Sequence, residues 1–528
     1  MEKTPLSRLS RRAVLSRGAG GAAALAVGGL LTGCGNDGTP AAEESYSGKP
    51  RKGGRLRAAF AGGSAESTSV VQATATVVDY VRARIVWDTL GELEGNKPVW
   101  RLAESVEHNA DATQWTIRVR KGVRFSDGAQ LDAHDVLFSL RTIAKHPGGQ
   151  AALLANADLA KARVRHDRTL VLPLKQPDGS FDLALAQSMF IFPDGTENLN
   201  KAPGTGPFVL KKWSPGKSSL LEANKEYWDA DSGGPYLDEV ELFSVGDAAA
   251  RLSGLKSGQF DYAGGVSLAT ARAEKANERL RILLPPKELW TELAFAMNLD
   301  VPPFTSAALA EAVKYAIDRE AMVKTVTLGF GEAAHDARGM HQPWYADDLP
   351  AREHDPDRAK ALLKKAGLGG KGVTLRTAAV AYGTVESASA FVQQAEAADL
   401  RVELDKVPAA DYYGDTDKLL HTPIQSAAYS PMPLPLELSN YYGSNASYPF
   451  TGKAPRRLES LLDDMRRAVS ETDRKRAVSD VQHYLHEKGG DAVFARLPSA
   501  AAATPEAQGV KALGWAEYPS LRDAFLAP

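Results

Sequence analysis

The chain holds a single cysteine, Cys34, so the long segment that follows it must fold without a disulfide bond. Residues 1–33 contain a basic segment with Arg11 and Arg12, followed by an apolar run over 22–31. This order is typical of an export signal, and the run has about half of the ~20 residues that a membrane-spanning helix needs. Removing residues 1–33 from 528 leaves too long a chain for one compact core, so we expect two or three domains.

Two short motifs in the first 34 residues indicate the route of export. Residues 10–15, SRRAVL, resemble the twin-arginine signal, and residues 31–34, LTGC, resemble the bacterial lipobox, in which the cysteine thiol carries diacylglycerol after cleavage. We therefore expect a signal peptide over 1–33, lipidation at Cys34 and a flexible tether over 34–52. The protein is then held on the outer face of a bacterial cell membrane. A plain secretion signal with a chance cysteine is the alternative.

Charge and hydrophobicity narrow the class of function. The formal net charge is −2, and no polybasic surface is indicated, so nucleic acid is not an expected partner. Hydrophobic residues make up 44% of the chain, which permits a buried core without disulfide bonds. No later apolar run reaches membrane-spanning length.

The segment after position 114 predicts a strand, a turn and a helix in close succession. Trp115, Ile117 and Val119 alternate with polar residues, as in a strand with one buried face. A turn is predicted at 126–128, and Asp132 fits the cap of the helix that follows. Strand and helix signals this close together favour a mixed α/β fold.

A second helix is predicted around position 360, because Asp355 fits a helix cap, Pro356 the first helical position and Gly367 a left-handed terminator. Apolar residues recur at helical spacing in 309–317 and 458–469. Strand-like segments lie between the helices, at 240–245, 373–377 and 401–404. The fold class is therefore α/β.

No pattern of residues indicates catalysis or a metal. Ser-x-x-Lys occurs at 214–217, in a predicted turn, and at 253–256, in a predicted helix with Lys256 facing water. His335, His341 and His354, with Asp336 nearby, lack the close spacing of metal ligands. We expect no enzyme, no metal and no cofactor.

Aromatic and amide residues gather in irregular segments of the second half of the chain. Planar rings with polar edges suit a concave site that buries a polar ligand. The alternative is that these side chains fix long loops to the core. They are Trp290, Trp344, Tyr345, Tyr382, Tyr429, Tyr441, Tyr442, Asn445 and Tyr448.

Motifs in a fixed order carry a resemblance to a known family. They are WTIRVRKGVRFSDGAQLDAHDVLFSL at 115–140, GTGPF at 204–208, NKEYW at 224–228, LKSGQFD at 255–261, MNL at 297–299, PPF at 302–304, AIDR at 316–319, and the segment 355–367. Together they resemble the family-five solute-binding proteins of bacterial ABC importers, which include dipeptide, oligopeptide and nickel binders.

This resemblance implies a two-lobed periplasmic-binding-protein-like fold of type II, with an extra subdomain in the first lobe. Lobe I is expected over 53–85, 203–293 and 499–528, its subdomain over 86–202, and lobe II over 294–498, with crossings near 293–299 and 493–498. The implied function is ligand capture between the lobes, as a monomer, and delivery to an ABC permease with its ATPase subunits. A surface sensor without transport and a secreted hydrolase are the alternatives.

The chain departs from the family where peptide binders hold the two charged ends of a peptide. The segment 425–433 corresponds to the one that carries an aspartate for the peptide ammonium, with Tyr429 near its place, and Tyr382 stands near the place of the arginine for the carboxylate. An unpaired buried ammonium is costly, so a free dipeptide is disfavoured. A blocked or long peptide or an oligosaccharide is favoured instead. Expected ligand contacts are Gly62, Gly63, Ser64, Trp290, Tyr382, Gln425, Ser426, Ala427, Ala428, Tyr429, Tyr441 and Asn445. For Gly62, Gly63 and Ser64 a plain strand-to-loop turn is equally consistent.

Overall fold

The computed structural model describes residues 48–68, 70–71, 76–95, 97–146, 149–187, 189–370, 372–412, 416–452, 454–511 and 518–528. Arg11, Arg12 and Cys34 lie outside these ranges. Every helix and strand described below belongs to the unit of residues 44–528. Within the described ranges no helix has both the length and the apolar character to cross a bilayer.

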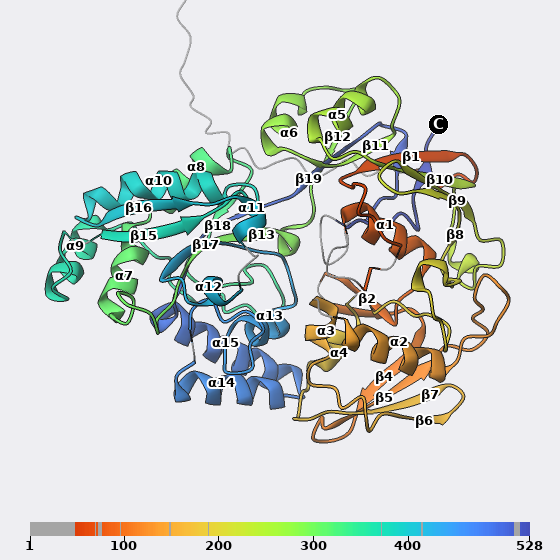
Figure 1. Cartoon of the computed structure of the whole chain (residues 1–528), viewed down its shortest axis with the longest axis horizontal. Helices are drawn as coiled ribbons and strands as arrows, with labels where there is room; N and C mark the ends of the chain where they lie inside the picture. Colours follow the sequence, from red (N-terminus) through yellow and green to blue (C-terminus); the bar gives the residue numbers. More distant parts are fainter. Residues whose placement is uncertain are drawn as a thin grey trace, which may run out of the picture. The chain divides into compact units, whose positions relative to one another are not determined.

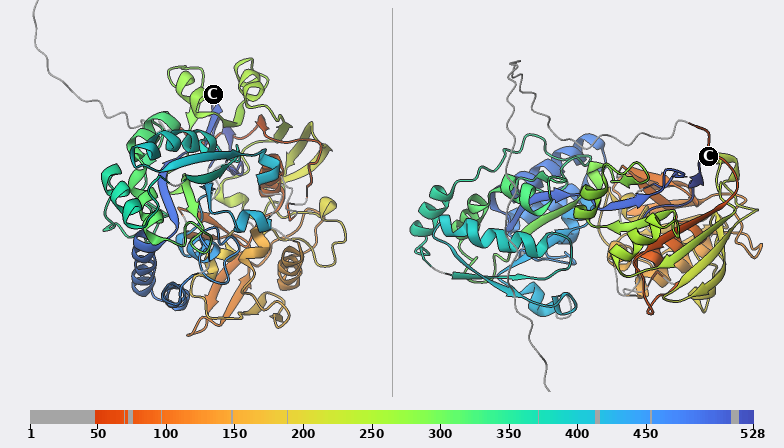
Figure 2. Two further views of the ribbon diagram at one scale, coloured as in Figure 1. Left: turned by 60° about the vertical axis from the view of Figure 1, so that its left-hand side comes forward. Right: turned by 90° about the horizontal axis from the view of Figure 1, so that it is seen from above.

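A seven-stranded sheet contains strands from both ends of the second unit. β1 pairs in parallel with β10 on one side and β11 on the other, and β11 pairs with β19 near the end of the chain. In Figure 2 the red β1 and the blue β19 lie in the same sheet. The order is β12-β19-β11-β1-β10-β9-β8, with bounds β1 Arg55–Phe60, β8 Phe208–Ser214, β9 Ser218–Ala223, β10 Glu239–Ser244, β11 Tyr262–Val266, β12 Arg281–Leu283 and β19 Ala500–Ala503. Its helices are α1 Val77–Val86, α5 Ala248–Lys256 and α6 Leu268–Glu274.

A six-stranded sheet forms the second large layer. Its central strand, β13, is almost continuously apolar, as expected for a strand that is covered on both faces. Phe295 of β13 packs between Phe391 and Phe494, with ring centroids 4.8 Å apart in each pair. The order is β14-β18-β13-β17-β15-β16, with bounds β13 Thr291–Met297, β14 Glu332–Ala333, β15 Gly372–Thr377, β16 Arg401–Lys406, β17 Ile424–Tyr429 and β18 Asp491–Leu497. Its helices are α7 Ala307–Ala316, α8 Arg319–Val326, α9 Pro356–Lys365 and α10 Thr384–Ala397.

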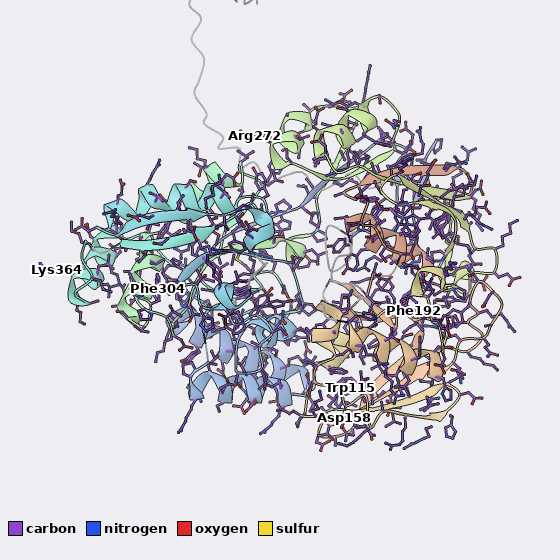
Figure 3. The ribbon with its side chains drawn as sticks, viewed as in Figure 1. Trp115, Asp158, Phe192, Arg272, Phe304 and Lys364 are labelled. Carbon is purple, nitrogen blue, oxygen red and sulfur yellow. The ribbon has the colours of Figure 1, made fainter. Side chains whose placement is uncertain are left out.

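A four-stranded sheet contains the strand predicted from the segment 115–140, and the predicted helix of that segment is α2. Trp115 is buried in β5, and Asp132 caps α2 by accepting from the backbone amides of His134 and Asp135, which confirms both predictions. Figure 3 shows Trp115 among these strands. The order is β4-β5-β7-β6, with β4 Ala103–His108, β5 Gln114–Val119, β6 Arg163–His166, β7 Thr169–Pro173 and α2 Ala133–Lys145. The hairpin β2 Gly91–Glu94 and β3 Lys97–Trp100 and the short helices α3 Gly149–Leu153 and α4 Phe181–Leu185 complete this part.

The predicted cap of α9 is also confirmed, since Asp355 accepts from the amide of Arg358 and Gly367 has a φ of 67°.

Three helices after β17 form a separate apolar cluster. The prediction of a buried helical face up to Val469 was wrong at its end, because the helix stops at Arg467 and Val469 is 39% exposed. The three helices are α13 Leu434–Tyr441, α14 Arg456–Arg467 and α15 Glu471–Lys488 (Figure 1). The remaining short elements are α11 Ala409–Tyr412, α12 Thr416–Leu420, β20 Ala507–Gln508, β21 Phe525–Leu526 and 3₁₀ turns at Leu199–Lys201, Ala230–Ser232 and Lys287–Leu289.

The chain passes between the two large sheets twice. One connection runs from β12 to β13 over 284–290, ahead of the predicted 293–299, and the other from β18 to β19 over 498–499. β13 and β18 pair antiparallel, with Thr291 opposite Leu497, so both connections leave the six-stranded sheet at one place. This pairing positions the residues of the candidate site.

Candidate functional site

The predicted contacts on β17 are largely occupied within the protein. Gln425 and Ser426 are buried; the Gln425 amide donates to the Leu419 carbonyl at 3.2 Å, and the Ser426 hydroxyl donates to Thr377 Oγ1 at 2.9 Å. Ala427 is buried and Ala428 half-buried beside them. These side chains fix β17 in the sheet, and direct ligand contact by them stays a prediction.

Tyr429 ends β17 and is one of two tyrosines that share a carboxylate. Its hydroxyl donates to Asp491 Oδ1 at 2.8 Å, and the Tyr442 hydroxyl donates to Asp491 Oδ2. Burial, followed by the nearby Asp491 charge, raises the pKa of both tyrosines well above the ordinary value. Both hydroxyls therefore remain protonated donors, and they hold the two rings in fixed positions.

Arg338 lies between two of the predicted tyrosines. Its Cζ is 3.5 Å from the ring centroid of Tyr429 and 3.9 Å from that of Tyr441, and its Nε donates to Glu437 Oε1 at 2.8 Å. The arginine is buried, so the two rings and the carboxylate replace water around the guanidinium. Sequence reasoning missed Arg338, which stands in an irregular segment and is one of 63 basic residues with no pattern around it.

A buried ion network continues from Arg338 toward the connections between the sheets. We refer to Arg338, Glu437, Glu292 and Arg496 as the Arg338 cluster. Glu292 Oε1 accepts from the Gly339 amide at 2.8 Å and lies 3.3 Å from Arg496 Nε. Burial raises the pKa of Glu292 and raises that of Glu437 to about 7, although the arginines oppose both shifts. Each arginine of the cluster therefore has a carboxyl group next to it inside the protein.

A cavity of about 310 Å³ opens beside this region. It has two walls, one from residues 152–184 around α3 and α4 and one from residues 435–466 around α13 and α14. Asn445 lines it, so one predicted contact residue lies in a space between segments far apart in sequence. Tyr441 belongs to the adjoining aromatic group, with its ring 4.8 Å from Tyr429 and 6.0 Å from both Tyr448 and Phe450.

The other predicted contacts do not line this cavity. Gly62, Gly63 and Ser64 follow β1, and a Cβ at Gly62 would lie 2.7 Å from atoms of Glu66 and Val78, which gives that glycine a packing role. Trp290 is buried, and its Nε1 donates to the Pro285 carbonyl at 3.0 Å. Tyr382 is 40% exposed.

The residues considered above as metal ligands or catalytic groups do not come together in one site. His341 lies 2.7 Å from Glu332, whereas His354 lies 3.8 Å from Asp318. Asp336 instead pairs with Arg319 and Arg352. Lys256 is half-exposed and pairs with Glu274, as its predicted outward position implies. In the described part of the chain no group of three or more His, Cys, Asp or Glu side chains is arranged to hold a metal ion.

The fold has two α/β layers that are joined by two connections, and a cavity has walls from segments that are distant in sequence. This arrangement defines the class of two-lobed periplasmic binding proteins. The chain belongs to the bacterial extracellular solute-binding proteins, family 5, whose model matches residues 97–449. The expected α/β fold and family are thereby confirmed.

Individual relatives have low sequence identity to this chain. The glutathione-binding protein GsiB of Salmonella paratyphi A is 29% identical over 302 residues, which are 56% of this chain and 58% of the relative's length. The periplasmic binding protein DppA of Helicobacter pylori, solved with the peptide STSA, has a TM-score of 0.74 at 19% identity over 90% of this chain and 99% of its own. NikA of Brucella suis, solved with Fe(III)-EDTA, has a TM-score of 0.75 at 18% identity over 90% and 100%.

Proposed function

We propose that the protein is the extracytoplasmic, lipid-anchored substrate-binding component of an ABC importer. It captures a peptide-like or other polar organic solute between two lobes and delivers it to a permease. The observation that carries the proposal is the cavity with one wall from residues 152–184 and the other from 435–466. A site divided in this way is complete only when both walls come together, which couples ligand binding to closure.

The moving parts in this proposal are the lobes expected from the sequence. Residues 53–85, 203–293 and 499–528 form lobe I, residues 86–202 its subdomain, and residues 294–498 lobe II. The connections at 284–290 and 498–499 act as the hinge. A ligand that contacts both walls stabilises the closed form, and the permease recognises that form.

The anchor and the partners follow from the first 34 residues. The twin arginines Arg11 and Arg12 direct export, and lipid on Cys34 keeps the protein at the membrane beside its permease. A single lipid-held copy needs no oligomer for this role, so the proposal includes a monomer.

The ligand is proposed from this chain's own residues and from what the relatives bind. GsiB binds glutathione, while DppA and NikA were solved with a peptide and a metal chelate, so the fold accommodates varied polar solutes. In this chain Arg338, which lies against the Tyr429 ring, is already paired with Glu437, and Asp491 already accepts from the hydroxyls of Tyr429 and Tyr442. Such a site favours a blocked or long peptide or an oligosaccharide over a free dipeptide.

A thermal-shift panel on the protein from residue 35 tests the function. The panel compares free dipeptides, longer and N-acylated peptides, oligosaccharides and nickel chelates. A ligand at a hundred times its Kd stabilises the folded protein by about 2.7 kcal/mol, which is a clear shift in melting temperature. A shift with any class supports solute binding, and a shift with free dipeptides alone overturns the preference for uncharged ends. The absence of a thermal shift with every compound of the panel contradicts the proposed function.

A further inference from the structure

We propose that the cavity between α3/α4 and α13/α14 is a ligand subsite for an uncharged segment that carries hydroxyl or amide groups, as in an oligosaccharide or an end-blocked peptide. The inference rests on the proposed function and specifies its ligand class. It concerns the cavity itself and not the Arg338 cluster, which does not line it.

The cavity walls combine short polar side chains with apolar ones. Hydroxyls and amides come from both walls, and so do apolar side chains. Such a lining suits a ligand with apolar faces and polar edges. A volume of about 310 Å³ lies at the lower end of the range of small-molecule sites, roughly 300–1,000 Å³, so the cavity holds one part of a larger ligand. The polar lining includes Gln176 and Ser180 on one wall and Ser439 and Asn445 on the other, and the apolar lining includes Phe181 and Leu436.

Ser180 supplies the observation that points to a ligand. Its backbone amide donates to Asp178 Oδ1 at 2.9 Å, but its hydroxyl is buried without a hydrogen-bond partner in the described structure. The side chain is 2% exposed and lines the cavity. A buried hydroxyl without a partner is unfavourable, so a polar group that enters the cavity gains a hydrogen bond there.

The charged residues of the lining already have partners in the protein. Lys175 Nζ donates to the Ala155 carbonyl at 2.7 Å, Arg466 pairs with Asp463, and Asp178 accepts from Ser180. A ligand carboxylate or ammonium that entered would lose its hydration and would have to compete with these existing contacts. An uncharged ligand segment avoids this penalty.

Isothermal titration calorimetry with defined probes tests the subsite. The neutral probes are maltotriose, chitotriose and N-acetyl-trialanine amide, and the charged probe is free trialanine. We expect a neutral probe to bind, and Ser180→Ala to weaken its binding by about five- to tenfold through the loss of one hydrogen bond. Ser439→Phe, which fills the cavity, should weaken it further. Ser389→Ala, an exposed serine on α10, is the matched control and should leave binding unchanged.

The outcomes separate the subsite from the proposed function. Equal binding of a neutral probe by the wild type, Ser180→Ala and Ser439→Phe overturns the subsite while solute binding stands. Binding of free trialanine alone has the same meaning. If no neutral probe binds, the subsite is also overturned. The proposed function itself is contradicted only if no compound of the wider thermal-shift panel shifts the melting temperature.

Discussion

Gly179 is the residue whose substitution most directly tests closure. It lies just before α4, and its amide donates to the Arg466 carbonyl at the end of α14 at 2.7 Å, while its own carbonyl accepts from Arg474 Nη2 at 2.5 Å. A Cβ at this position would lie 2.3 Å from the Ala468 carbonyl oxygen. The φ of Gly179 is outside the left-handed region, so alanine is compatible with the local backbone and opposes only the contact between the two walls.

The size of the effect follows from the two hydrogen bonds. The bond from the Gly179 amide contributes about 1 kcal/mol, and the bond from the charged Arg474 about 1.5–3 kcal/mol. Loss of both disfavours the closed form by roughly 2.5–4 kcal/mol, which corresponds to a decrease of roughly 70- to 900-fold in its population relative to the open form. When only the closed form binds fully, the apparent Kd rises by up to the same factor.

Two measurements on Gly179→Ala check this reasoning. Calorimetry with a ligand from the thermal-shift panel should show the rise in Kd, and small-angle X-ray scattering should show a larger radius of gyration with ligand present. Gly369→Ala is the matched control, because a Cβ there meets no atom within 4 Å and its φ is also outside the left-handed region. Equal Kd and scattering for the two variants would refute the proposed role of the contact.

Two further predictions concern buried charges. Arg338→Met leaves Glu437 buried without its cation, whereas Glu292 keeps Arg496, and should lower the free energy of unfolding by about 3–5 kcal/mol in urea denaturation. Arg401→Met, at a side chain that is 73% exposed, should be neutral, and equal stability of the two variants contradicts the prediction. Burial raises the pKa of Asp88 to about 6 in the folded protein, against about 3.9 in an unfolded chain. The folded state therefore binds more protons between about pH 4 and pH 6, so the free energy of unfolding falls by about 3 kcal/mol as the pH rises through that window. Asp88→Asn should remove this contribution to the slope, the exposed Asp231→Asn should keep it, and an unchanged slope in Asp88→Asn argues against the assignment.

Local patterns predicted those elements whose signals lie within a few residues of one another. The β5 strand, the Asp132 cap of α2 and the Asp355 cap of α9 were all found in this way, because side-chain alternation and capping are set by neighbours in sequence. The end of α14 was missed, since Val469 continues the apolar spacing but lies beyond the last helical residue.

The composition of the candidate site could not be read from such patterns. Tyr429, Tyr441 and Asn445 were singled out from the sequence, but Arg338 and Asp491, which contact the tyrosines, come from other segments. The loop with Gly179 likewise meets α14 only in three dimensions. No local signal marks these residues, because each owes its role to a partner hundreds or dozens of positions away.

The sequence by itself thus determined the α/β class, the family and the elements with local caps and periodicity, through interactions that act within one or two turns of chain. Only the tertiary structure decided which charges lie beneath the tyrosine rings and which polar groups line the cavity. The physical reason is that strand register and helix packing, such as the pairing of β13 with β17 and β18, bring together side chains that the chain itself keeps apart.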